Sequence, residues 1–178
     1  MRMDRKKLSA RSMMRYLLLA ALVLLVLGLL LPMQRTMPVK GADRTSFAHD
    51  SFWYYPWGRS GTHKGIDIFA TKGTAVQAAA GGVVLYAGTK AVGGNIVLVL
   101  GPKWRLFYYA HLDTIMVHSG DLVSHHEQLG TVGNSGNAAG KPPHLHYAIV
   151  TLVPYPWRVD GDHQGWKKAF YLDPSEHV

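Results

Sequence analysis

The chain has 178 residues, which is long enough for one folded domain with a hydrophobic core once its N-terminal segment is set aside. It contains no cysteine, which excludes disulfides and thiolate chemistry and leaves His, Asp and Glu to build any metal site. The formal charge of +8 does not indicate a nucleic-acid partner, because residues 1–15 carry a net charge of +5 and the rest of the chain only +3.

The basic N-terminus directly precedes an uncharged apolar run from Tyr16 to Met33. At about 1.5 Å per helical residue this run spans about 27 Å, slightly less than the ~30 Å hydrocarbon core of a bilayer. We expect a basic cytoplasmic tail over residues 1–15, one transmembrane signal-anchor over residues 16–33 and export of everything that follows. A cleaved signal peptide is the alternative, although the segment after Leu31 lacks a small-residue cleavage pattern.

Residues 34–50 are polar and lack periodicity, which is typical of a linker, and we place one domain at residues 51–178. Runs that favour β structure, separated by strong turn signals, lie at residues 75–80, 82–87, 95–100, 105–111, 128–132 and 144–150. The second and third runs are apolar throughout, which suits strands covered on both faces. Since most connections are too short for crossover helices, we expect a mainly β fold of largely antiparallel sheets that form a groove.

Two histidines flank Leu145 at the start of the last of these runs. Because side chains along a strand alternate between its faces, His144 and His146 should point to the same side. Two adjacent imidazoles on one face are suited to metal binding. Taken alone, the pattern is explained at least as well by partly buried, hydrogen-bonded histidines.

A second pair, His63 and Asp67, is spaced by four residues. A glycine and two β-branched residues between and beside them argue against a helix. A straight strand would separate the two Cα atoms by about 13 Å, too far to share one ion bound at roughly 2 Å. The chain must therefore bend if they share an ion, and Lys64–Gly65 is the natural place. The alternative is that Asp67 caps a turn and His63 is solvated.

A further histidine, His111, ends the aromatic run LFYYAH and could by itself be structural. A catalytic zinc site typically uses three protein ligands from His, Asp and Glu and leaves a fourth position for water. It also needs a neighbouring group that exchanges protons near neutral pH, which is the natural range of histidine. The chain supplies three candidate ligands and two further histidines on neighbouring predicted strands.

Together these motifs resemble the lysostaphin-like peptidoglycan zinc metallopeptidases. The resemblance rests on HKGID, YAHL and PHLH, and on the connecting segments GTAVQAAAGGVVLYAG, GGNIVLVL and GTVGNSGNAAGKPPHLHY, all in the family's order over about residues 60–150. It implies that His63, Asp67 and His146 bind one Zn²⁺ per chain. It also implies that His111 and His144 are unligated catalytic histidines that line the cleft.

The resemblance further implies an endopeptidase that hydrolyses peptide bonds of bacterial peptidoglycan. With the anchor, it would be a single-pass protein of the cytoplasmic membrane whose catalytic domain lies on the periplasmic or extracellular side. Bound zinc would polarise the scissile carbonyl and lower the pKa of its water toward about 7. The two histidines would transfer protons or stabilise the oxyanion.

Other readings of the same residues remain open. One is a non-catalytic regulator of other cell-wall hydrolases, although degenerate members of this family lack ligands that are complete here. Another is a structural zinc site, which would need four protein ligands where three match. A nucleic-acid-binding module fits least well, because the exported part is nearly balanced in charge.

Two features depart from the family pattern or fall outside it. The family commonly has Phe-Glu after the H-x-H pair, whereas this chain has Tyr147-Ala148, so any role of that Glu is missing or supplied differently. An aromatic segment upstream could line the groove or simply pack: Trp53, Tyr54, Tyr55 and Trp57. The remaining histidines are predicted to be solvated: His49, His118, His125, His126, His163 and His177.

Overall fold

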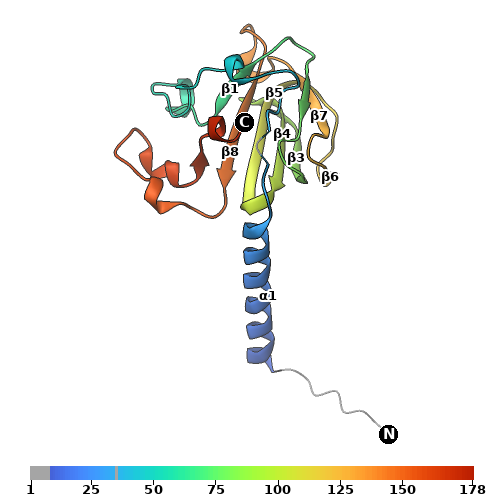
Figure 1. Cartoon of the computed structure of the whole chain (residues 1–178), viewed down its shortest axis with the longest axis vertical. Helices are drawn as coiled ribbons and strands as arrows, with labels where there is room; N and C mark the ends of the chain where they lie inside the picture. Colours follow the sequence, from blue (N-terminus) through green and yellow to red (C-terminus); the bar gives the residue numbers. More distant parts are fainter. Residues whose placement is uncertain (1–8, 35) are drawn as a thin grey trace.

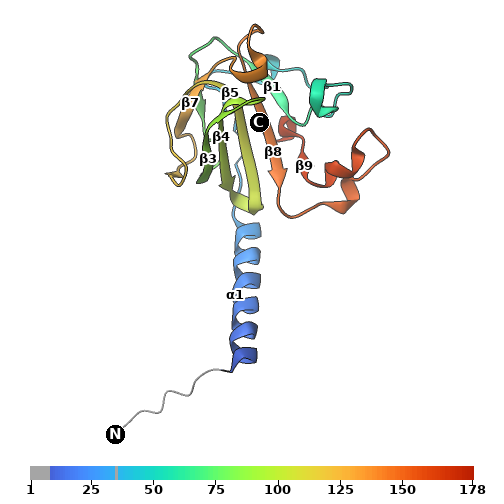
Figure 2. The same cartoon turned by 180° about the vertical axis from the view of Figure 1, so that it is seen from behind.

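A β domain stands on a single helical stalk (Figures 1 and 2). This computed structural model describes residues 9–34 and 36–178, so most of the predicted cytoplasmic tail, residues 1–8, lies outside the described residues. Helix α1 runs from Ala10 to Leu30 and is capped by Ser9, whose side chain accepts a hydrogen bond from the backbone N–H of Ser12. None of its residues is buried, and among the described residues it is the one helix long and apolar enough to cross a membrane.

Nine strands within the described part of the chain form one sheet in which the paired strands are antiparallel. They are β1 Ile66–Phe69, β2 Ala75–Gln77, β3 Gly82–Lys90, β4 Gly94–Gly101, β5 Arg105–Ile115, β6 Leu122–Val123, β7 Gln128–Val132, β8 His144–Thr151 and β9 Tyr171–Leu172. The order is β1-β8-β5-β4-β3-β6, with β7 paired to β2 and β5, and β9 paired to β8. The predicted mainly β, largely antiparallel fold is confirmed.

Short 3-10 helices fill several connections. They are η1 Arg44–Ser46, η2 Gly58–Ser60, η3 Pro102–Trp104, η4 Gly136–Ala138, η5 Pro156–Arg158, η6 Gly165–Ala169 and η7 Pro174–Glu176. Of these, η2 directly follows Trp57 in the chain, and η3 joins β4 to β5.

The six predicted β runs correspond to β2, β3, β4, β5, β7 and β8. Strand β4 is largely buried, as its apolar sequence predicts. Strand β3 is not covered on both faces, and Leu85 is 47% exposed. Leu85 is the extra residue of a β-bulge, because Val84 and Tyr86 pair with consecutive residues of β4 and leave Leu85 without a partner there.

The core lies between the central strands and the segments that cover them. Its largest fully buried side chains are Ile66, Ile68, Phe107, Tyr109, Leu112, Leu129, Leu145, Tyr147 and Ile149. The predicted linker also contributes, because Val39 is 1% exposed and forms a β-bridge with Val76, and Phe47 is 5% exposed. Part of residues 34–50 therefore packs with the domain. Two apolar residues eight positions apart in a polar stretch carry no periodic signal, so this packing could not be predicted from the sequence.

Candidate metal centre

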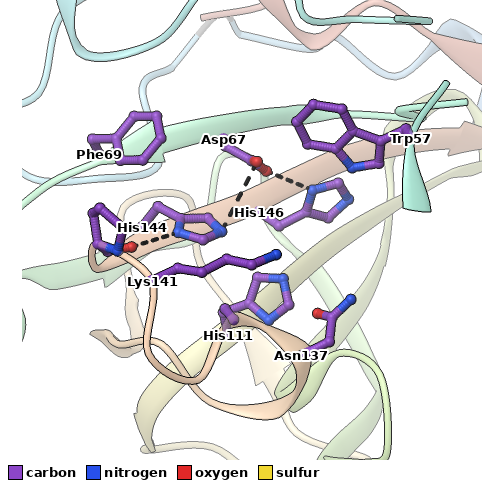
Figure 3. A pocket seen from close by; sticks show the side chains of 10 residues that line it. Trp57, Asp67, Phe69, His111, Asn137, Lys141, His144 and His146 are labelled. Carbon is purple, nitrogen blue, oxygen red and sulfur yellow. Dashed lines mark hydrogen bonds and ion pairs between the residues drawn. The ribbon is translucent and has the colours of Figure 1, made fainter. Parts of the chain in front are cut away.

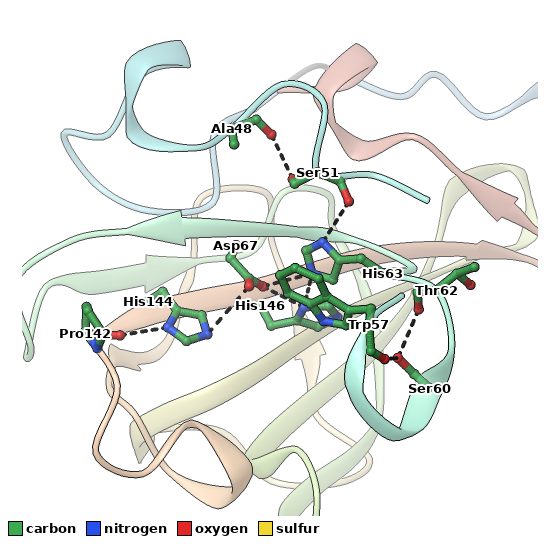
Figure 4. Close-up of polar contacts among 10 residues, drawn as sticks. All are labelled: Ala48, Ser51, Trp57, Ser60, Thr62, His63, Asp67, Pro142, His144 and His146. Atoms are coloured by element: carbon green, nitrogen blue, oxygen red, sulfur yellow. Dashed lines mark hydrogen bonds and ion pairs between the residues drawn. The ribbon is translucent and has the colours of Figure 1, made fainter. Parts of the chain in front are cut away.

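Three predicted site residues converge from separate parts of the chain. Asp67 on β1 and His146 on β8 are direct partners in the antiparallel register of these strands, so their side chains lie on the same face. His63 precedes β1 in the chain and reaches the same place (Figure 4). The Nε2 atom of His63 lies 3.1 Å from Asp67 Oδ1 and 3.2 Å from His146 Nδ1, and the last two atoms are 2.8 Å apart.

These three distances fit the requirement of one zinc ion. In a tetrahedral site with bonds of about 2.0–2.1 Å, the ligand atoms lie about 3.3 Å from one another. Two imidazole nitrogens and one carboxylate oxygen are ordinary zinc ligands. Among the described residues, the group of side chains that could hold a metal ion consists of His63, Asp67 and His146.

The predicted bend between His63 and Asp67 is present. Strand β1 begins only at Ile66, and the chain bends at Gly65. A Cβ atom on Gly65 would lie 2.4 Å from the carbonyl oxygen of Tyr147, so the backbones of the two segments approach more closely than any side chain would allow. The bend brings the imidazole of His63 back over the carboxylate of Asp67.

Backbone carbonyls orient three of the imidazoles. His63 Nδ1 donates a hydrogen bond to Ser51 O at 3.0 Å, which leaves the lone pair of Nε2 for the metal position. His144 Nδ1 donates to the carbonyl of Pro142 at 2.8 Å, and His111 Nδ1 donates to the carbonyl of Ser135 at 2.9 Å. Both of these histidines therefore present Nε2 as an acceptor when they are neutral.

His111 and His144 lie beside the candidate metal site without belonging to the group of side chains that could hold an ion (Figure 3). Their ring centroids are 5.1 Å apart, and the ring of His111 lies 6.0 Å from that of His146. His144 Nε2 is 3.9 Å from Asp67 Oδ2. The five predicted residues thus form one cluster, in which potential ligand atoms of His63, Asp67 and His146 converge and His111 and His144 lie beside them.

His111 reaches the cluster through an irregularity in β5. Its φ is +64°, a left-handed conformation that is uncommon for residues other than glycine, and the register of β4 with β5 shifts between Asn95 and Val97. As a result, Tyr109 and Leu112 both enter the core although they are three residues apart, and His111 faces the cleft. Strict alternation along the strand does not predict this orientation.

Burial and hydrogen bonds set the charge of two cluster residues. Burial acts to raise the pKa of Asp67, but hydrogen bonds from His146 and His63, together with the charges of these imidazoles, outweigh it and hold the pKa well below its ordinary value. Burial, together with the neighbouring His146, lowers the pKa of His111 from 6.5 to about 4. At neutral pH Asp67 is therefore ionised and His111 is neutral.

A groove opens onto the cluster. Its lining includes Trp57, Tyr108, His111, Asn137 and Lys141. Asn137 and Lys141 were not among the predicted groove residues. Their place shortly before the H-x-H pair is the signal that could have drawn attention to them.

The aromatic residues upstream of β1 differ in whether they line the groove or pack against the domain. Trp57 lines the groove. Trp53 is 8% exposed, and its indole Nε1 donates to the carbonyl of His163 at 3.1 Å, so it packs. Tyr54 and Tyr55 are more than half exposed, at 53% and 56%.

The histidines outside the cluster are only partly as predicted. Four are exposed: His49, His118, His126 and His163. His125 is half-buried, and its Nε2 lies 2.6 Å from the hydroxyl of Thr36. His177 is half-buried too, and its carbonyl accepts a hydrogen bond from the N–H of Thr36 at 3.1 Å. His125 and His177 are therefore less solvated than expected, because the segment after α1 contacts both.

Both the sequence and the fold are similar to those of known peptidases. The family model described as Peptidase family M23 matches residues 61–159. The crystal structure of the catalytic domain of the antimicrobial peptidase lysostaphin from Staphylococcus simulans superposes with a TM-score of 0.56 at 26% identity, covering 71% of this chain and 86% of that chain.

Two curated relatives differ in their described roles. An L-Ala–D-Glu endopeptidase from Bacillus subtilis (strain 168) is 35% identical over 115 residues, which are 60% of this chain and 35% of the relative. The murein hydrolase activator NlpD from Salmonella dublin is 32% identical over 128 residues, which are 66% of this chain and 33% of the relative. The matched segments span only about a third of either relative.

Proposed function

This chain belongs to peptidase family M23, and from that premise we propose that it is a zinc-dependent endopeptidase that hydrolyses peptide bonds of bacterial peptidoglycan. One observation carries the proposal: His63, Asp67 and His146 hold three ligand atoms 2.8–3.2 Å apart beside an open groove. A structural zinc site would instead have four protein ligands and no open position.

When bound, zinc supplies Lewis-acid polarisation of the scissile carbonyl and of the attacking water. Side chains of the protein provide the negative charge at the site and the proton transfers. Asp67 stays ionised because its pKa is held low. His111 stays neutral near pH 7 because burial lowers its pKa, so its Nε2 can accept a proton. His144 presents Nε2 to the same space, so an imidazole that has accepted the water's proton at Nε2 can donate that same proton to the leaving amine.

The charge of the groove favours an acidic peptide. Arg59, Lys64 and Lys141 line it, and Asp67 is the one carboxylate among its lining residues in the described part of the chain. The ammonium of Lys64 already donates to the carbonyls of Ser60 and Thr62. We therefore propose that Lys141 meets a substrate carboxylate, which wall stem peptides carry and glycine bridges lack.

Helix α1 supports a location in the cell envelope. We propose that it is a single-pass anchor, with residues 1–15 on the cytoplasmic side and the β domain outside the cytoplasmic membrane. The predicted linker, residues 34–50, would then connect the anchor to the domain, with part of it packed on the sheet. Peptidoglycan lies in the same compartment.

A second candidate function is regulation of another wall hydrolase, because one relative is named a murein hydrolase activator. Digestion of purified sacculi by the zinc-loaded full-length protein separates the two candidates. We expect released fragments with newly formed peptide ends, identified by mass spectrometry, and none with Asp67→Ala. Intact cross-links in the presence of stoichiometric zinc would contradict the enzymatic proposal and favour the regulator.

A further inference from the structure

Tyr108 lines the groove beside the candidate metal centre, and its hydroxyl is an unused donor. Within the described part of the chain this hydroxyl has no hydrogen-bond partner, whereas that of Tyr109 accepts from the N–H of Ala79 at 2.9 Å. Its oxygen is not among the enclosed polar atoms that lack a partner there, so it reaches the open groove. Burial raises the pKa of the half-buried phenol, so the hydroxyl keeps its proton at neutral pH and can donate to an acceptor.

The geometry of β5 directs Tyr108 to the face that carries the cluster. Side chains alternate along the strand, and the neighbours Phe107 and Tyr109 are both fully buried in the core. Tyr108 therefore points to the opposite face, together with Ala110, which pairs with His146 on β8. The phenol ring lies edge-on to the imidazole of His146, with ring centroids 6.1 Å apart and planes inclined by 73°. The ring thus adjoins one of the predicted zinc ligands.

Gly93, in the turn before β4, makes room for the hydroxyl. A Cβ atom at this position would overlap Oη of Tyr108 and would lie 2.7 Å from Ile96 Cγ2. The φ of Gly93 is not positive, so the glycine is needed for the close approach of the ring and not for the conformation of the turn. Close packing therefore fixes where the hydroxyl lies, although no hydrogen bond of the protein holds it.

The part of the groove that Tyr108 lines is rich in donors. Its volume is about 840 Å³, which is within the range of ligand-binding cavities. The 3-10 helix η2 and the turn at residues 91–93 border it, and its cationic side chains are Arg59, Lys64 and Lys141. None of its described lining residues is an Asp or Glu. This lining suits a ligand with several acceptors, and a peptide offers one carbonyl at every residue.

From these observations we infer that the hydroxyl of Tyr108 donates a hydrogen bond to a backbone carbonyl of the substrate peptide. The inference deepens the proposed peptidase activity and rests on the groove being the place where the peptide binds. A backbone carbonyl is the acceptor because a neutral phenol needs no charged partner, and because every peptide presents such carbonyls whatever its side chains. Tyr108 thus aligns the peptide beside the metal position without taking part in the proton transfers.

Removal of the hydroxyl alone tests the inference. Tyr108→Phe keeps the ring, and Tyr86→Phe is the matched control, because the hydroxyl of Tyr86 donates to the carbonyl of Thr89 at 3.1 Å outside the groove. The probes are cross-linked peptides freed by an amidase from the glycan of purified sacculi, used as released and after amidation of their carboxylates. Initial rates of the zinc-loaded full-length proteins give KM and kcat. Calorimetric titration of the same proteins in a His144→Ala background gives Kd without turnover.

We expect Tyr108→Phe to raise KM and Kd about fivefold for both probes, because a hydrogen bond made equally in the ground and transition states affects binding and not kcat. Zinc content and kcat should stay constant, and Tyr86→Phe should behave as the unaltered protein. An unchanged Kd, a fall in kcat alone, or an effect confined to the probe with free carboxylates would overturn the inference.

The two measurements separate this inference from the proposed peptidase activity. If the unaltered protein binds the peptides without cleaving them, the proposed activity fails, while the change in Kd still decides the role of Tyr108. If the unaltered protein does not bind the peptides at all, the inference about Tyr108 is overturned as well.

Discussion

The indole of Trp57 stacks on the imidazole of His63, with ring centroids 4.1 Å apart and planes inclined by 24°. His63 is 1% exposed, whereas Trp57 is 38% exposed, so the indole shields the imidazole from solvent on the groove side. At the edge of the ring, Nδ1 donates a hydrogen bond to the carbonyl of Ser51. The imidazole of His63 is therefore held by two separate contacts.

Removing the indole of Trp57 should weaken zinc binding. We predict that Trp57→Ala lowers zinc affinity by about tenfold, because changes beside a ligand typically cost 10- to 100-fold. Competition with a chromogenic chelator measures the effect. Trp57→Phe keeps an aromatic ring over His63 and should bind zinc nearly as well as the unaltered protein. Equal affinities for all three proteins would argue against a role of the stacking.

Loss of one ligand should abolish zinc binding and activity without unfolding the domain. Asp67→Ala removes the one carboxylate of the cluster, so we predict less than one zinc per chain and cleavage at the rate of a blank. Metal analysis and sacculus digestion give the two readouts, and far-ultraviolet circular dichroism should be unchanged. Full zinc occupancy in this variant would show that the ligand set is wrong.

The two flanking histidines should affect catalysis and not metal content. We predict that His111→Ala and His144→Ala each lower kcat by about 10²- to 10⁴-fold, the usual contribution of a general acid or base. Zinc stoichiometry should remain at one. His118→Ala provides the matched control, since His118 is exposed and outside the cluster. Loss of zinc in either variant would instead place that histidine among the ligands.

The zinc-free protein should lose stability on acidification. The pKa of His111 falls from 6.5 to about 4 on folding, so the unfolded chain binds a proton that the folded chain resists. The free energy of unfolding is therefore unaffected by His111 above about pH 6.5. It decreases as pH falls from there toward 4, by up to about 3 kcal/mol. Below that pH, protonation of Asp67, whose folded pKa is held low, removes more. Urea unfolding in a chelator from pH 8 to 4 measures the loss, which should be smaller in His111→Asn.

Lys141 should select substrates that carry a carboxylate. We predict that Lys141→Ala raises KM about tenfold for a stem peptide with a free carboxylate, because a charge-assisted hydrogen bond contributes about 1.5–3 kcal/mol. The amidated form of the same peptide should show little change, and kcat should stay constant. Lys72→Ala is the control, since Lys72 pairs with Asp113 outside the groove. An equal effect on both peptides would rule out recognition of a carboxylate.

Much of the architecture could be predicted because it follows from short-range patterns. Alternating and apolar runs between glycine-rich turns located six strands, and the H-x-H spacing correctly placed His144 and His146 on one side of β8. The need to share an ion located the bend at Gly65. These inferences require only strand geometry and the steric freedom of glycine.

What could not be predicted depends on long-range packing. The bulge that turns His111 into the cleft is set by its pairing with β4, which the local sequence does not encode. Val39 enters the core through a bridge to Val76, far along the chain. Trp53 packs, whereas Trp57 lines the groove, and this difference likewise depends on contacts with distant residues such as His163.

Crystals of the zinc-loaded protein, measured with X-rays at the zinc absorption edge, test the central claim most directly. We predict one anomalous peak per chain at about 2.0–2.1 Å from His63 Nε2, Asp67 Oδ1 and His146 Nδ1, with the fourth position open to the groove and filled by water. A peak elsewhere in the molecule, or a fourth ligand supplied by the protein, would contradict the account of a catalytic zinc site.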